Sequence, residues 1–273
     1  MKNKIIILII LYFSTKLSAQ SQVTWFPSSL NIQPFTANIL EPRAGFAFQT
    51  GGNKIRLDIS RSQDVAHIDY KNFTLSFGAD LFTFTRLRAE SEFHFPVETI
   101  DYLFGINSGC RVIKENIEYG LRFRLSHISA HFVDGQYDYK INFWRNGRSA
   151  IVYTREFIEL FPYYSFNNLR FYGGFSWLFH RKPFDIGREV YQAGFDYYYT
   201  KFENIFPYVA YDFKLISINK YSGSNILTAG IKFGDYKSKG FSLAVTYFAG
   251  KSIHGEYYNL NESYTTIGFN LDL

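Results

Sequence analysis

The sequence predicts an all-β membrane protein, a single transmembrane outer-membrane β-barrel of about twelve antiparallel strands. Aromatic residues make up 20% of the 273 residues, with 22 Tyr and 30 Phe, and these residue types favour strands and membrane–water boundaries. Many segments alternate apolar and polar residues, which places the two kinds on opposite faces of a strand. No stretch after the amino-terminal segment holds roughly 18 consecutive apolar residues, so the sequence excludes spanning helices.

Residues 1–20 have the features of a secretory signal peptide. Two lysines precede an apolar run, Ile5–Phe13, and small residues lead to Ala19. The run is too short for a spanning helix, so we expect cleavage near Ala19 and export to the outer membrane of a Gram-negative bacterium. Cleavage removes three of the 29 Lys and Arg, against 24 Asp and Glu. This near balance, with interspersed charges, gives no support for nucleic-acid binding.

Residues 21–40 contain two prolines and no clear period, and we expect a periplasmic or lumenal lead-in. Residues 41–273 are predicted to form the barrel, with strands near 43–50, 54–60, 72–84, 101–113, 116–130, 150–161, 169–179, 190–201, 205–217, 226–234, 240–249 and 264–273. Short polar turns alternate with longer links, as expected for periplasmic turns and outer loops. The pattern fits poorly at Gly51-Gly52, which is tight where an outer loop belongs. The single cysteine, Cys110, cannot form an internal disulfide.

The strand near 116–130 shows the alternation most clearly. Its apolar parity runs from Ile117 to Leu125, and charged residues, glycine and serine occupy the other parity. The strand begins at a short turn and ends at a long link, so its far end is expected at outer-leaflet depth. His127, Ser129 and His131 continue the lipid-facing parity there.

The pair His127 and Ser129 suggests nucleophilic catalysis. Two residues on one face of a strand are about 6.7 Å apart, and side chains that lean together can close this gap. His127 could then take the proton of the Ser129 hydroxyl as it attacks an ester carbonyl of an outer-membrane lipid. A third group must orient the imidazole. Glu156 on the next strand is the first candidate, and Asn142 is the second.

Other interpretations of these residues remain open. The His-x-Ser pair also fits the polar rim where a strand leaves the hydrocarbon. A metal site is a further possibility, because carboxylates suit Ca²⁺ and paired imidazoles suit Zn²⁺, and the candidate ligands in the expected outer loops are His131, Asp134, His254 and Glu256. Their spacing is not tight, so solvated loop residues are an alternative. Lumenal charges such as Arg56 and Lys232 could line an ion path or bridge one another.

Five sequence blocks resemble, in order, the DUF1207 family of exported bacterial proteins: Glu41–Arg43, Arg124–His131, Tyr153–Glu156, Leu169–Gly174 and Tyr247–Tyr258. The family pattern resembles H-x-S-S-H, and Ala130 replaces its second serine here. The resemblance spans nearly all of the chain after the signal peptide. It implies an exported bacterial protein and no established activity.

The His-x-Ser strand alone is similar to outer-membrane phospholipase A, a family of twelve-stranded barrels with this pair on the lipid-facing wall. His127 and Ser129 match in type and spacing. Ala130 stands where an asparagine would follow, so the similarity does not extend to the orienting residue or to calcium dependence. Two functions follow as hypotheses: a lipid acyl-ester hydrolase acting on phospholipid or lipid A, or a non-enzymatic barrel that is structural, docks a partner or conducts small solutes.

Overall fold

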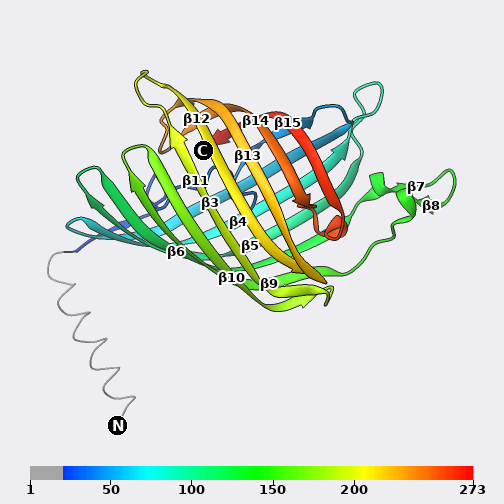
Figure 1. Cartoon of the computed structure of the whole chain (residues 1–273), viewed down its shortest axis with the longest axis horizontal. Coiled ribbons are helices and arrows are strands. Elements are labelled where there is room, and N and C mark those ends of the chain that lie inside the picture. Colours follow the sequence, from blue (N-terminus) through cyan, green and yellow to red (C-terminus); the bar gives the residue numbers. More distant parts are fainter. Residues whose placement is uncertain (1–20, 273) are drawn as a thin grey trace, which may run out of the picture.

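Twelve antiparallel strands close into a barrel in the structure, a computed structural model that describes residues 21–272 (Figure 1). The predicted signal peptide lies outside these residues. The barrel strands are β2 (Ala44–Gln49), β3 (Lys54–Tyr70), β4 (Phe73–Arg88), β5 (Val97–Lys114), β6 (Ile117–Phe132), β9 (Tyr153–Phe166), β10 (Leu169–Lys182), β11 (Ile186–Tyr198), β12 (Ile205–Ile218), β13 (Lys220–Gly234), β14 (Gly240–Lys251) and β15 (Asn261–Asp272). Pairing of β2 with both β3 and β15 completes the ring. The predicted fold class and strand number are confirmed.

The two ends of the barrel differ in the length of their connections. One end carries the two-residue turns Lys71-Asn72, Glu115-Asn116 and Asn167-Asn168, and the end of β15. The first residue of each turn has positive φ, between 52° and 54°. The other end carries the longer links 89–96, 133–152 and 252–260. Short turns are periplasmic and long loops extracellular in bacterial barrels, so β6 runs outward.

Three predicted links are wrong. The link expected at 180–189 comprises only residues 183–185, because β10 extends to Lys182 and β11 begins at Ile186. The link expected after residue 60 is absent, because β3 continues to Tyr70. A β-bulge between Asp64 and Ala66 shifts the alternation there, which hid the second half of this strand. The long link expected at 218–225 is a one-residue turn at Asn219, whose φ is 60°. The residues after it pair with β12 although they carry no apolar alternation.

The wall has an apolar exterior and a polar interior. On β6 the outward side chains Tyr119, Phe123 and Leu125 are exposed, whereas the inward Arg122 and Arg124 are buried. A closed barrel satisfies all of its backbone groups within the wall, as a membrane-spanning structure must. The chain therefore forms a barrel of the outer-membrane type. None of the helices in the described part of the chain is long and apolar enough to cross a membrane.

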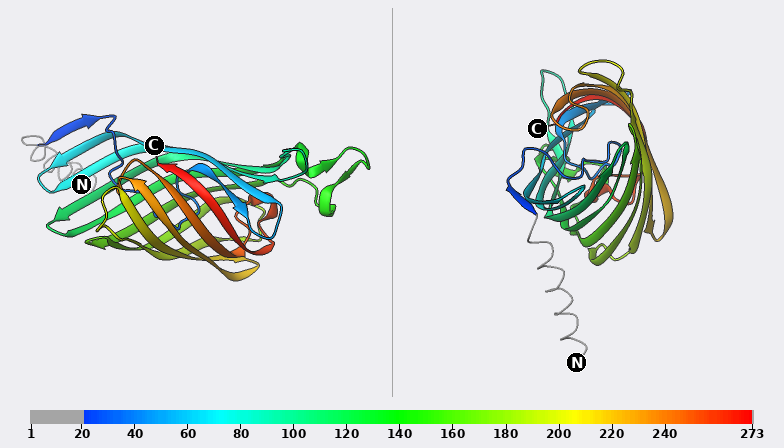
Figure 2. Two further views of the ribbon diagram at one scale, coloured as in Figure 1. Left: turned by 90° about the horizontal axis from the view of Figure 1, so that it is seen from above. Right: turned by 90° about the vertical axis from the view of Figure 1, so that its left-hand side faces the viewer.

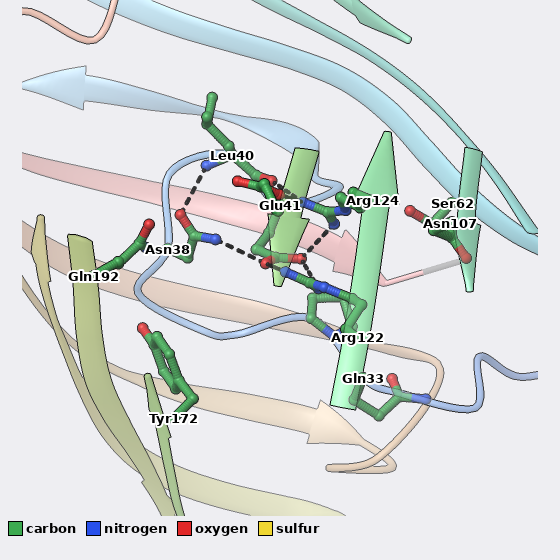
Figure 3. Close-up of polar contacts among 12 residues, drawn as sticks. Gln33, Asn38, Leu40, Glu41, Ser62, Asn107, Arg122, Arg124, Tyr172 and Gln192 are labelled. Atoms are coloured by element: carbon green, nitrogen blue, oxygen red, sulfur yellow. Dashed lines mark hydrogen bonds and ion pairs between the residues drawn. The ribbon is translucent and has the colours of Figure 1, made fainter. Parts of the chain in front are cut away.

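Residues 26–43 enter the lumen and fill part of it (Figure 2). Before them, β1 (Gln22–Trp25) pairs with the end of β3. Phe35 is fully buried and stacks on Tyr172 with ring centroids 4.1 Å apart, and burying such a side chain contributes about 1.5–3 kcal/mol. Glu41 is buried between two arginines of β6, with its oxygens 2.6 Å from Arg122 and 3.0 Å from Arg124 (Figure 3). Residues 26–43 are hereafter called the lumenal segment.

Candidate functional site

His127 and Ser129 lie on the outward face of β6, toward its extracellular end. The inward residues between and beside them, Ile128 and Ala130, are almost fully buried in an apolar cluster inside the lumen. This packing fixes the strand, so the outward side chains have a defined direction. The His127 ring lies 4.7 Å, centroid to centroid, from Phe104 on β5, which is exposed. The imidazole therefore sits among side chains of the lipid-facing wall.

Glu156 of β9 lies directly opposite His127 in the antiparallel ladder. Side chains opposite one another in such a ladder are in contact distance. Its Oε1 is 2.7 Å from Nδ1 of His127, and the Thr154 hydroxyl donates to the same oxygen at 3.1 Å. Both side chains of the pair are about three-quarters covered, with exposed fractions of 28% for His127 and 26% for Glu156. The first candidate for the orienting residue thus contacts the imidazole.

A second imidazole, which sequence reasoning missed, binds the other oxygen of Glu156. His180 of β10 hydrogen-bonds through Nδ1 to Oε2 of Glu156. It reaches Glu156 because the register of β10 against β9 shifts between Leu178 and His180. Phe179 and His180 are consequently both exposed. Strict alternation would have assigned these neighbours to opposite faces, so no sequence pattern indicated this contact.

Ser129 lies beside this group, with Thr154 opposite it on β9 and Tyr102 opposite it on β5. In the region that the structure describes, no hydrogen bond joins Ser129 to His127, and Nε2 of His127 has no recorded partner. The ring nitrogen held by Glu156 is Nδ1, which leaves Nε2 to accept a proton. This is the nitrogen that a neighbouring hydroxyl needs for activation.

Asn142, the second candidate for the orienting residue, lies elsewhere. It belongs to the loop between β7 (Tyr137–Asp138) and β8 (Phe143–Trp144), a hairpin that projects beyond the extracellular end of the barrel (Figure 2). Its side chain accepts a 2.6 Å hydrogen bond from the Tyr137 hydroxyl, and its φ of 55° suits a turn. The structure brings Glu156, and not Asn142, to His127.

The four metal-ligand candidates do not converge. Of the described residues, no group of three or more His, Cys, Asp or Glu could hold a metal ion. His131 lies on the outer wall with its ring 6.2 Å from that of Tyr102, and Asp134 accepts from the backbone N–H of Gly135. These two therefore serve the wall and a turn, respectively, rather than a common ion.

His254 and Glu256 instead form contacts that hold the extracellular loop 252–260 against the barrel. His254 Nδ1 lies 2.8 Å from the Asp101 carboxylate, and both groups are buried. Glu256, in the short helix η3 (Gly255–Tyr257), accepts backbone N–H groups of Phe132 and Ile151 at 3.2 Å each. Burial raises the pKa of Glu256 above its ordinary value. In the described structure these two side chains therefore hold the loop in place.

Comparison with known proteins places the chain in a family. The model of the family described as "Protein of unknown function (DUF1207)" matches residues 55–272. The chain belongs to the DUF1207 family. No curated protein matches this DUF1207 sequence.

Solved structures share the fold of this DUF1207 barrel. Outer membrane phospholipase A from Escherichia coli superposes with a TM-score of 0.55 at 13% identity, over 86% of this chain and 92% of that chain. The beta domain of the Bordetella autotransporter BrkA gives a TM-score of 0.42 at 10% identity, over 85% of this chain and 100% of that chain. OmpT of Vibrio cholerae gives a TM-score of 0.38 at 7% identity, over 92% of this chain and 98% of that chain. At such low identity the first likeness concerns the fold alone, and the other two carry no argument.

Proposed function

We propose that this outer-membrane barrel is a serine-type acyl-ester hydrolase that acts on phospholipid or lipid A at the outer leaflet. Ser129 is the nucleophile, His127 the general base and Glu156 the residue that orients His127. The observation that carries the proposal is the 2.7 Å contact between His127 and Glu156 on the lipid-facing wall beside Ser129. The proposal includes export by a signal peptide at residues 1–20, cleaved near Ala19.

The proposed chemistry follows from the hydrogen bond between Nδ1 of His127 and Glu156. In the tautomer of His127 that donates from Nδ1 to Glu156, Nε2 is the acceptor. The mechanism requires the Ser129 side chain to rotate so that its hydroxyl reaches Nε2, a contact that often tightens only when substrate binds. The Ser129 oxygen then bonds to the ester carbon while its proton passes to Nε2. That proton leaves with the alcohol of the lysolipid, and water releases the fatty acid from Ser129.

The surroundings of the pair suit an acyl chain. Exposed Tyr102, Phe104 and Leu125 flank the site on β5 and β6. Apolar surface of this kind contacts lipid tails without the desolvation cost that a polar substrate would bring. Glu156 carries the charge that stabilises the imidazolium during the reaction, in a medium where ionic interactions are strong. A protein with this fold that bears the name phospholipase A is in keeping with the proposal.

The test is fatty-acid release by the purified, folded protein from radiolabelled phospholipid and from lipid A in mixed micelles. Ser129→Ala is expected to abolish release, because it removes the proposed nucleophile. Ser126→Ala is the matched control: it makes the same change on the same strand, but Ser126 is buried toward the lumen and its hydroxyl bonds to nothing. The control is expected to keep the wild-type rate. No release from the wild type would favour a non-enzymatic barrel.

A further inference from the structure

The lumen contains a cavity of about 980 Å³ that the lumenal segment does not fill. Residues from both ends of the barrel line this one cavity. Asn53 and Lys54, at the extracellular turn between β2 and β3, belong to its lining, and so do Lys237 and Ser238, in the periplasmic turn between β13 and β14. The cavity therefore runs along the length of the barrel.

Small side chains leave this space open. On one side the cavity is bounded by the lumenal segment, which Glu41 anchors to the far wall of the barrel. On the other side the inward positions of the seam between β13, β14, β15 and β2 carry residues with little bulk: Gly45, Ala47, Thr228, Ala244, Thr246 and Gly268. The opposite wall packs Phe161, Tyr163 and Tyr172 against the lumenal segment. On the seam the inward rings of Phe248 and Tyr264 stack on each other at 5.1 Å, and the small residues leave the remaining space open. The opening is thus encoded by side-chain size.

The charges on the cavity wall are unequal. Ten Lys and Arg line it against seven Asp and Glu. Several of the acidic groups are neutralised locally, as Asp58 is by Arg56 at 2.7 Å and Asp272 by Lys232 at 2.6 Å. Four of the ten basic residues form no ion pair among the described residues: Arg43, Arg61, Arg111 and Lys239. Arg61 and Lys239 are exposed, whereas Arg43 and Arg111 are partly buried.

Arg43 and Arg111 have no carboxylate partner within the described part of the chain. The Arg43 guanidinium donates only to the backbone oxygens of Thr36 and Asn38, at 2.8 and 3.2 Å. Nε of Arg111 is buried without any hydrogen-bond partner. Unpaired guanidiniums beside a narrow aqueous path attract anions and repel cations, because the low-dielectric wall focuses their field.

We propose that the lumen is a passage for small anions such as chloride, running between the lumenal segment and the β13–β2 seam. This is a further function and is independent of ester hydrolysis, which takes place on the outside of the wall. The path would admit small hydrated ions past Arg43 and Arg111 and exclude bulky solutes.

The test is the conductance of the full-length folded protein in a planar lipid bilayer with a KCl gradient. The expected result is a steady conductance whose reversal potential has the same sign as the equilibrium potential of chloride. Arg111→Gln and Arg43→Gln are each expected to reduce the preference for chloride, and the double variant to abolish it. Lys140→Gln is the matched control, because Lys140 is exposed on the extracellular hairpin, outside the cavity lining. It is expected to leave the reversal potential unchanged.

Ala244→Trp checks that the current uses this cavity, because the larger side chain fills the space beside the seam. The expected result is loss of conductance, with folding verified by the altered migration of the unheated barrel in a detergent gel. Absence of conductance in the wild type, a reversal potential of the potassium sign, or unchanged conductance in folded Ala244→Trp would overturn the proposal. Fatty-acid release is measured on the same preparations, so failure of one proposal is distinguishable from failure of the other.

Discussion

At the residue scale, Glu156 is the centre of the proposed site because it divides its two oxygens between two imidazoles. Oε1 faces His127 and Oε2 faces His180. His127 is the more covered of the two rings, with 28% of its side chain exposed against 55% for His180. Only His127 has a serine two residues away on the same face. In the proposed mechanism the two histidines therefore have different roles, with His127 as base and His180 as a second hydrogen-bond partner of the carboxylate.

Glu156→Gln tests the role of the carboxylate. An amide can still contact Nδ1, but it carries no charge to stabilise the imidazolium, and it can hold the ring in the wrong tautomer. The rate of fatty-acid release is expected to fall by roughly 10²-fold or more, with little change in the unfolding transition. His180→Gln is expected to keep most of the rate, because it leaves the contact between Glu156 and His127 intact. Equal rates for Glu156→Gln and the wild type would exclude Glu156 from the mechanism.

The sequence predicted part of this site and not the rest, for a physical reason. His127, Ser129 and Glu156 lie in strands of regular alternation and regular pairing. The face of the strand on which each lies, and the adjacent strand, could therefore be inferred. His180 follows a shift of register after Leu178, and nothing in the local sequence marks that shift. Asn142 was a weaker alternative because the residues around it suggested a loop, and it lies in a hairpin beyond the wall.

At the element scale, strands with regular alternation were predicted and strands with an irregularity were not. The bounds of β6 were predicted to within two residues because apolar and polar residues alternate along it without interruption. The second half of β3 was missed because its bulge at Asp64 reverses the alternation. The turn at Asn219 was missed because the residues after it, 220–225, show no apolar alternation although they pair with β12. Patterning therefore predicts strands best where both lipid and lumen select the side chains.

The extracellular loop that contains η3 gives a prediction about pH. Burial raises the pKa of Glu256 above its ordinary value of 4.5, with the backbone N–H groups of Ile151 and Phe132 acting in the opposite direction. A carboxyl whose pKa is raised on folding stabilises the folded loop fully below its unfolded pKa, and this contribution is lost as pH rises through the raised value. The amides of Phe132 and Ile151 should therefore be better protected near pH 4 than near pH 8, after correction for intrinsic exchange.

Hydrogen exchange of the folded barrel in detergent measures this protection. Glu256→Gln is the control, since its amide does not ionise over this range. Its single oxygen accepts one of the two N–H groups, which Glu256 receives on separate oxygens. Its protection is expected to depend little on pH. Equal pH dependence in the variant and the wild type would assign the effect to another group, such as the buried pair of Asp101 and His254.

At the scale of the whole molecule, the barrel separates two environments that the two proposals use independently. The outward face of β5, β6 and β9 presents the proposed hydrolytic group to lipid, and the lumen presents an uneven distribution of charge to water. The hydrolase proposal depends on the orientation of the barrel, because short periplasmic turns place the extracellular end of β6 at the outer leaflet. Inversion of the barrel would place Ser129 at the inner leaflet instead.

The most direct measurement of the central claim, that Ser129 is an activated nucleophile at the outer leaflet, is covalent labelling of intact cells that carry the protein. The reagent is a charged fluorophosphonate that does not cross the outer membrane, and mass spectrometry locates the label. The expected result is phosphonylation of Ser129, present in Ser126→Ala and lost in His127→Ala. An unlabelled Ser129 in the wild type, or a label that persists in His127→Ala, would contradict the account.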